Sequence, residues 1–306
     1  MRKRDILAFA AGIFILGYIV YSLDPQKVAS ALLKTKPEYF MLAALFYFAN
    51  EVLAAFVLKT MTTSKISLSN VLLSHMCGML YANATPGRVG YYYTSFSIAK
   101  KTGTSRSGNI GILTLYQGMN FFLKVLFCIM ALIYFSAYIT DAGSQEYLLL
   151  AGVFPVIGVI IIAVVLYTKI LNRLLGKLPK GSTLLEYVDR MQDATREISK
   201  MRILKLSLLT SCGWLLSSAQ WFFLAVSMGA TISYVTALML QPILTTVMFV
   251  PLSPSGLGLA EGGSALLFKA VGLTLADGVA FMLLVRVNSI IVDSIGLLDL
   301  RKKNAT

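Results

Sequence analysis

Seven ionisable side chains stand within stretches that are otherwise apolar, and each could bind a charge or move a proton. They are Glu51, Arg88, Lys124, Glu261, Lys269, Arg286 and Asp293. Charged groups are costly in a membrane interior, so those that occur there are candidates for function. Arg88, Lys124 and Arg286 would attract an anion such as a phosphate, and Glu261 would balance part of their charge. Lys269 stands near a membrane surface and is expected to reach the lipid head groups.

Two of these cations belong to polar faces of predicted helices. The spacing i, i+3, i+7 places three side chains on one side of an α-helix, and it occurs twice. The two sets are Gln117, Asn120 and Lys124, and Arg286, Ser289 and Asp293. We expect both faces to border one central cavity. The alternative is that the charges pair with one another, for example Glu261 with Arg286, and only hold the helices in place.

The remaining reactive residue types give weaker signals. Cys77, Cys128 and Cys212 lie in apolar runs without metal-ligand spacing, so neither a zinc site nor a disulfide scaffold is predicted. His75 is the one histidine of the chain and could relay protons or be a satisfied structural side chain. Because no ATP-binding motif is present, we expect no cofactor.

The composition predicts an integral membrane protein. Of the 306 residues, 57% are apolar and only 13% are charged, and the mean hydropathy is +0.75. A net charge of +13 would suit nucleic acid, but the cations flank apolar runs. There, membrane orientation and anionic lipid head groups account for them, so no nucleic-acid partner is expected.

Six apolar runs are long enough to cross the hydrocarbon core of a bilayer. They are residues 6–23, 38–58, 108–138, 147–167, 203–228 and 275–298. Three shorter runs, at 68–83, 89–99 and 257–271, do not reach across, and 234–250 is borderline. We interpret the shorter runs as arms of re-entrant hairpins.

The distribution of Lys and Arg predicts the orientation, because cytoplasmic loops are rich in these residues. There are three in residues 1–5, two in 59–67, three in 100–107, nine in 169–205 and three after Asp299. Both termini are therefore expected in the cytoplasm. The hairpin around Pro86 then enters from the cytoplasmic face, and the hairpin around Pro254 enters from the opposite face. The predicted fold is an all-α bundle of six spans with two opposed re-entrant hairpins.

The same plan predicts an inverted repeat within a single transmembrane domain, residues 1–306. Its halves are residues 1–138 and 147–300, joined by a cytoplasmic amphipathic helix at 183–200. The halves align at an offset of 168 positions. In that alignment Thr85, Pro86, Val89, Gly90 and Lys101 match Ser253, Pro254, Leu257, Gly258 and Lys269. Inverted repeats with broken helices are typical of secondary transporters.

The Pro and Gly residues of the two hairpins predict where the helices break. Each break exposes free N–H groups and the positive end of a helix dipole, which suits an anion. The candidate positions are Pro86 and Gly90 in the first hairpin, and Ser253, Gly256 and Gly258 in the second. The alternative is that the glycines only allow helices to pack closely.

The segment PLSPSGLGLAEG at residues 251–262, followed by a span that carries Arg286, resembles the flippase-like membrane domain of the lysylphosphatidylglycerol synthase/flippase family. Glu261 and Arg286 match the characteristic residues of that family, and the likeness extends over nearly the whole chain. Gly90 is followed by Tyr91 where the family usually has Gly-Glu, and residues 116–120 replace a Glu-Arg-x-x-Asp pattern. These departures remove two acids and an arginine from the expected cavity and leave the substrate open.

The resemblance implies a flippase or scramblase that moves a lipid between leaflets in the plasma membrane of a prokaryote. Its partners would be lipids with an anionic or aminoacylated head group, or polyprenyl-phosphate-linked lipids. Relatives that also synthesise the lipid carry a soluble aminoacyltransferase domain after the membrane part, and this chain ends at Thr306, so no enzyme activity is expected.

Two other functions stay open. One is an intramembrane lipid-modifying transferase that uses Glu261 with Asp293 or His75. The other is a secondary transporter of a soluble anion. The sequence does not set the oligomeric state, and a homo-oligomer is compatible with it.

Overall fold

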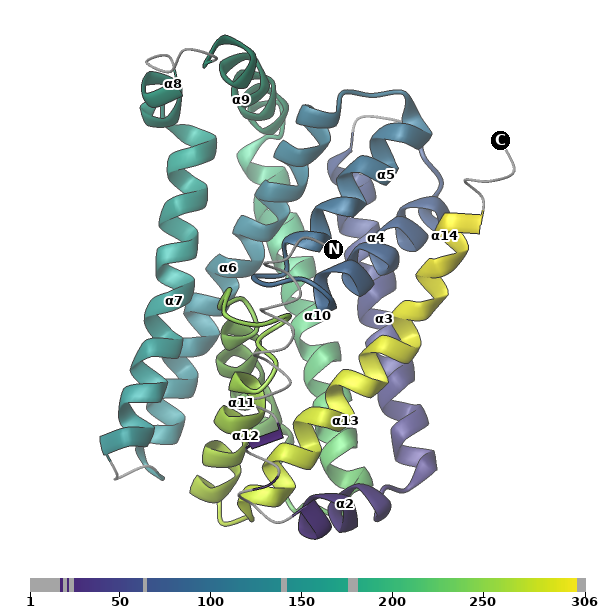
Figure 1. Cartoon of the computed structure of the whole chain (residues 1–306). Helices are drawn as coiled ribbons and strands as arrows, with labels where there is room; N and C mark the ends of the chain where they lie inside the picture. The colour runs from purple at the N-terminus through teal and green to yellow at the C-terminus, as the bar shows by residue number, and fades with distance from the viewer. Residues whose placement is uncertain are drawn as a thin grey trace.

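The computed structural model describes residues 17–18, 21, 25–62, 65–138, 142–175 and 181–301, and they form a bundle of helices (Figure 1). The first half contains α2 (Pro25–Leu33), α3 (Pro37–Met61), α4 (Leu68–Asn83), the 3₁₀ helix η1 (Val89–Tyr92), α5 (Tyr93–Thr102) and α6 (Arg106–Ser136). The second contains α7 (Ala142–Tyr167), α8 (Ile170–Leu175), α9 (Gly181–Arg196), α10 (Lys200–Ser227), α11 (Tyr234–Val247), α12 (Leu259–Ala270), α13 (Leu275–Asp293), η2 (Ser294–Leu297) and α14 (Leu298–Arg301).

Four helices in the described ranges are long and apolar enough to cross a membrane. They are Pro37–Met61, Arg106–Ser136, Lys200–Ser227 and the continuous stretch Leu275–Leu300. These helices confirm four of the six predicted spans. The predicted span 147–167 falls within α7, and the span predicted at 6–23 lies almost wholly outside the described residues. The protein is therefore a multi-pass membrane protein.

Hydroxyl side chains set the starts of several helices. Ser67 Oγ accepts the backbone N–H of Asn70 at 3.3 Å, and Ser233 Oγ accepts that of Thr236 at 3.0 Å. Thr274 and Asp277 form a reciprocal capping box at the start of α13. Each cap satisfies an N–H group that has no partner inside the helix, which fixes where the chain leaves its loop.

The amphipathic linker predicted over 183–200 is the shorter helix α9, which begins at Gly181 and ends at Arg196. Ser199 then caps α10, because its Oγ accepts the N–H of Arg202 at 3.3 Å. Helix α9 packs against the start of α6, and a Cβ added at Gly111 would lie 2.5 Å from the carbonyl oxygen of Met191. The absence of a side chain at this glycine lets the two backbones approach.

The two pairs of short helices lie at opposite ends of the bundle. Figure 1 shows α4 and α5 in the upper part and α11 and α12 in the lower part, with the long helices α3, α6, α10 and α13 running past both. One hydrophobic cluster surrounds α11 and α12, and another joins α3, α4 and α6. The loops that connect each short pair therefore meet between the two clusters.

Candidate functional site

The two Pro-containing loops contact each other directly. Pro86 and Pro254 form an isolated antiparallel bridge, and the backbone N–H of Ser255 donates to the carbonyl oxygen of Thr85 at 3.3 Å. Buried backbone groups need such partners, because no water is available to replace them. The meeting point of the loops is thus fixed by backbone hydrogen bonding.

Both loops reverse direction through two consecutive residues with left-handed backbone. Gly87 and Arg88 have φ of 61° and 56°, and Ser255 and Gly256 have φ of 46° and 63°. These pairs occupy matching positions at the offset of 168. Within the described ranges, Arg88 and Ser255 are the non-glycine residues with positive φ. Such backbone is strained for residues with a side chain and is concentrated at functional sites.

Glu261 and Arg286 form a salt bridge that holds the second loop in place. The Arg286 guanidinium also donates from Nη2 to the carbonyl oxygen of Ser255 at 3.0 Å. Glu261 is fully buried, and its Oε2 accepts the backbone N–H of Gly258 at 2.7 Å. The pairing of Glu261 with Arg286, which the sequence left open, therefore exists. It positions the loop around Pro254, which contacts Pro86.

A cavity of about 430 Å³ lies beside the loops. Its walls come from α3, α4, α6, α10, α11 and α13, together with both loops. Five of the predicted site residues line it: Arg88, Gln117, Asn120, Lys124 and Arg286. The polar face predicted for α6 borders the cavity with all three of its members. Of the face predicted on α13, Arg286 and Ser289 line the cavity and Asp293 does not.

Arg88 and Lys124 bring positive charge to this cavity, and neither forms a salt bridge in the part of the chain that the structure describes. Arg88 donates to Ser255 Oγ at 3.4 Å and contacts the sulfur atoms of Met79 and Met248. Lys124 is 5% exposed and donates to a single backbone carbonyl, that of Thr245 at 3.2 Å.

Both cations contact the ring of Phe249. Its centroid is 5.7 Å from Arg88 Cζ and 4.1 Å from Lys124 Nζ. Aromatic faces attract cations and help to hold them in an apolar setting. Neither cation forms a salt bridge in the described part of the chain, so both keep donors that could bind an anion.

The other predicted site residues support the cavity from behind or within the loops. Asp293 is fully buried and accepts from the hydroxyl of Tyr47 at 3.2 Å. The Gly90 N–H donates to Thr85 Oγ1 at 2.8 Å, and Ser253 Oγ donates to the Leu257 carbonyl at 2.8 Å. The positions outside the cavity lining are Pro86, Gly90, Ser253, Gly256, Gly258, Glu261 and Asp293.

Sequence reasoning missed a buried polar group on the cavity wall. Glu51 on α3, His75 on α4 and Tyr91 on η1 line the cavity and contact one another. His75 Nε2 lies 2.9 Å from Glu51 Oε2, and His75 Nδ1 lies 2.9 Å from the Tyr91 hydroxyl. Glu51 stood out as an ionisable residue within a span, but no spacing rule links three residues on three different elements.

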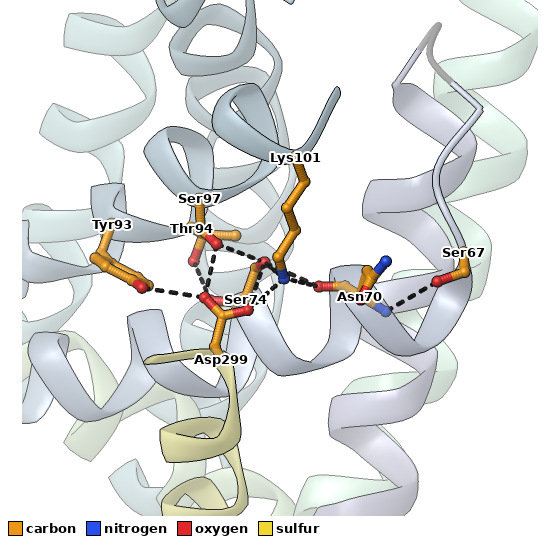
Figure 2. A network of polar contacts seen from close by, with 8 residues as sticks. All are labelled: Ser67, Asn70, Ser74, Tyr93, Thr94, Ser97, Lys101 and Asp299. Atoms are coloured by element: carbon orange, nitrogen blue, oxygen red, sulfur yellow. Dashed lines mark hydrogen bonds and ion pairs between the residues drawn. The ribbon is translucent and has the colours of Figure 1, made fainter. Parts of the chain in front are cut away.

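A second polar cluster lies away from the cavity, where α14 meets α4 and α5 (Figure 2). Asp299 forms a salt bridge with Lys101 and accepts from the hydroxyls of Ser97 at 2.7 Å and Tyr93 at 3.0 Å. Ser74 Oγ lies 2.9 Å from Ser97 Oγ. We call this group the Asp299 cluster. It ties the last helix to the first pair of short helices.

The described ranges contain no group of three His, Cys, Asp or Glu side chains arranged to hold a metal ion. The polar groups of the site are cations, amides, hydroxyls and one carboxylate–imidazole pair, which border a partly open cavity with apolar walls. Such a set can bind a charged group and exchange protons with it.

Comparisons with known proteins identify the family to which this chain belongs. No curated protein matches the chain. The sequence model of the lysylphosphatidylglycerol synthase TM region matches residues 6–296, which covers every helix described above up to the middle of η2. The chain therefore belongs to the lysylphosphatidylglycerol synthase TM region family.

Proposed function

We propose that the protein moves a lipid with an anionic head group between the two leaflets of a prokaryotic plasma membrane. The lipid would be an anionic or aminoacylated phospholipid, or a polyprenyl-phosphate-linked lipid. Its head group would enter the cavity and bind Arg88 and Lys124, while its hydrocarbon chains stay in the bilayer. Membership of the family supports a lipid-related role, and the cavity supports the choice of an anion.

The observation that carries this proposal is a pair of cations beside Phe249, the buried Lys124 and the partly buried Arg88. A buried charge without a counter-ion is unfavourable, because the protein interior solvates it poorly. A phosphate between Arg88 and Lys124 would supply the missing charge and accept hydrogen bonds from both. A binding role explains why neither side chain forms a salt bridge with a carboxylate in the described part of the chain.

The paired loops support a transport mechanism. The left-handed pairs Gly87–Arg88 and Ser255–Gly256 match across the proposed repeat, and the loops join at Pro86 and Pro254. We infer that the halves are inverted, that the loops dip from opposite faces and that both termini are cytoplasmic. Tilting one half against the other would expose the cavity to each leaflet in turn.

The polar partners of the candidate acids favour transport over group transfer. Glu261 contacts Arg286 and Gly258, whereas Asp293 contacts Tyr47. His75 contacts Glu51 and Tyr91. Glu261, which a transferase would pair with Asp293 or His75, is thus bound to other partners than either of them. Apolar wall residues such as Trp214 and Ile290 suit an amphiphile better than a soluble anion.

Reconstituted liposomes test the proposal. Trace fluorescent phosphatidylglycerol is placed in both leaflets, and a membrane-impermeant quencher reports how fast inner-leaflet lipid reaches the outside. We expect faster movement than in protein-free liposomes. Arg88→Gln and Lys124→Gln should each slow it about tenfold to a hundredfold, because a hydrogen bond to a charged group contributes about 1.5–3 kcal/mol.

Lys269→Gln is the matched control, since Lys269 is exposed on α12 and lies outside the cavity. Equal rates of lipid movement for this control and the two cavity variants would refute the proposal that the cavity binds the lipid head group. Uptake of labelled inorganic phosphate without lipid movement would instead identify a transporter of a soluble anion.

A further inference from the structure

Glu51, His75 and Tyr91 form a continuous polar chain inside an apolar bundle. Their exposed fractions are 1%, 3% and 3%, and they come from three separate elements that border the cavity. The contacts of 2.9 Å on both sides of the imidazole leave no room for water between the side chains. Because burying these groups is costly, the arrangement calls for a functional explanation.

One oxygen atom of the Glu51–His75–Tyr91 group lacks a hydrogen bond. Glu51 Oε2 is buried and accepts none from the described residues, although His75 Nε2 lies at ion-pair distance. A buried carboxylate oxygen without a donor is unfavourable by about 1–3 kcal/mol. A proton on the carboxylate relieves this penalty because it removes the charge, and a proton on the neighbouring imidazole offsets that charge. The orphaned oxygen therefore marks a place where a proton binds.

The Tyr91 hydroxyl allows the chain to hold either protonation state. When the imidazole is neutral with its proton on Nε2, the hydroxyl donates to Nδ1. When both ring nitrogens carry protons, Nδ1–H donates to the hydroxyl oxygen, because a phenol can donate and accept. One proton can thus be gained or lost without moving heavy atoms. Histidine is the side chain whose charge changes most readily near neutral pH.

The charges around Glu51 connect this chain to the anion site. The charged groups that interact with it electrostatically are Arg88 on the first loop and Asp293 on α13. The titratable groups are Tyr47 on α3, Tyr116 on α6 and Tyr91. Arg88 is therefore shared, since it lies in the cavity as a proposed anion ligand and also acts on Glu51.

The matching helices of the second half carry no such chain. On α10, Gln220 donates to Asn288 at 3.0 Å, and on α11, Gln241 donates to Ser217 at 2.6 Å. Both glutamines line the cavity, and neither amide changes charge with pH. Of the helices α3, α4, α10 and α11, only α3 and α4 contribute to the Glu51–His75–Tyr91 group.

We propose that Glu51, His75 and Tyr91 form a proton-binding site that couples the movement of an anionic lipid to the movement of a proton in the same direction. This inference rests on the proposed function. A head group bound at Arg88 offsets the positive charge of that side chain, which makes a proton on the Glu51–His75 pair more favourable. By linkage, the proton in turn favours the bound head group. One anion and one proton cross together without net charge.

A pH gradient across reconstituted liposomes tests the coupling. For one proton per lipid, a gradient of one pH unit drives trace fluorescent phosphatidylglycerol to about a tenfold excess in the leaflet that faces the alkaline side. This tenfold ratio is an equilibrium value, so it does not depend on which way the protein is oriented in the liposome. Glu51→Gln and Tyr91→Phe should abolish the excess but still let the lipid equilibrate between leaflets.

Two conservative variants serve as controls. Glu186→Gln changes an exposed glutamate on α9, and Tyr92→Phe removes a hydroxyl that contacts Thr114 outside the cavity. Both should retain the wild-type excess. If wild-type protein equilibrates the lipid but builds no excess, the coupling is overturned and the proposed function stands. If the lipid does not move at all, the proposed function fails.

The single histidine gives a second measurement that does not depend on transport. In protein labelled with ¹⁵N-histidine and purified without a polyhistidine tag, every imidazole signal comes from His75. Adding short-chain phosphatidylglycerol near neutral pH should shift these signals toward the protonated form. Arg88→Gln should remove the shift, and Lys269→Gln should keep it. Unchanged wild-type signals when lipid binds would overturn the inference.

Discussion

Arg88 and Lys124 lie against the same aromatic ring, with Arg88 Cζ and Lys124 Nζ at 5.7 and 4.1 Å from the centroid of Phe249. Two cations on one ring repel each other, and among the described residues neither of them forms a salt bridge with a carboxylate. Their positions are held by the fold: Arg88 stands in a strained loop, and Lys124 extends from a membrane-spanning helix. In the proposed function, these two cations bind the negative charge of a lipid head group.

Removing one of these cations should not destabilise the protein. We expect Arg88→Gln and Lys124→Gln to keep or raise the melting temperature in detergent, because each variant relieves repulsion and breaks no salt bridge. The measurement is thermal unfolding followed by tryptophan fluorescence. A large drop in melting temperature for both variants would show that the cations serve the fold.

The salt bridge between Glu261 and Arg286 should behave in the opposite way. Glu261→Gln leaves the Arg286 guanidinium without its counter-ion, and the loss of one partner of a buried pair costs about 3–5 kcal/mol. Replacing both residues with glutamine should recover part of this loss. Unfolding of the two single variants and the double variant measures the coupling. Additive losses would mean that the two side chains do not act as a pair.

A substitution in the Asp299 cluster should lower the stability of the protein without changing the cavity. Asp299→Asn weakens the charge-assisted bonds from Lys101, Ser97 and Tyr93, which should destabilise the contact between α14 and α5 by about 1–3 kcal/mol. Limited proteolysis near the C-terminal end should become faster. The rate of lipid movement per folded molecule should match that of wild type, and a selective loss of transport would link the cluster to the cavity.

The proposed inverted topology predicts the side from which each short pair is reached. In a background without reactive cysteines, Lys100→Cys at the end of α5 should react with an impermeant maleimide from the cytoplasmic face. Lys269→Cys at the end of α12 should react from the opposite face. Both positions are exposed on the protein. Reaction from one common side would refute the inverted arrangement.

Local patterns in the sequence were sufficient to predict most of the scaffold. Long apolar runs predicted four spans to within a few residues at each end, because the membrane imposes a minimum length on any crossing helix. The i, i+3, i+7 spacing predicted that Gln117, Asn120 and Lys124 share the cavity-facing side of α6. The recurring Pro and Gly residues marked both loops, and the loops meet at the two prolines.

Side-chain partners could not be predicted in the same way, because they depend on how distant elements pack. Asp293 follows the spacing of Arg286 and Ser289, yet it lies behind the cavity against Tyr47. The same spacing keeps Lys124 on the cavity wall of α6, so the difference arises from packing, because Asp293 lies where α13 contacts α3. The contact of Glu51 with His75 joins α3 to α4, and no periodicity within either helix reports it.

The most direct test of the central claim is a structure of the protein with bound phosphatidylglycerol in lipid nanodiscs. We predict density for the head group inside the cavity, with its phosphate within hydrogen-bonding distance of Arg88 and Lys124 and beside the ring of Phe249. Lipid density confined to the outer surface of the bundle, with the cavity empty under saturating lipid, would contradict the account.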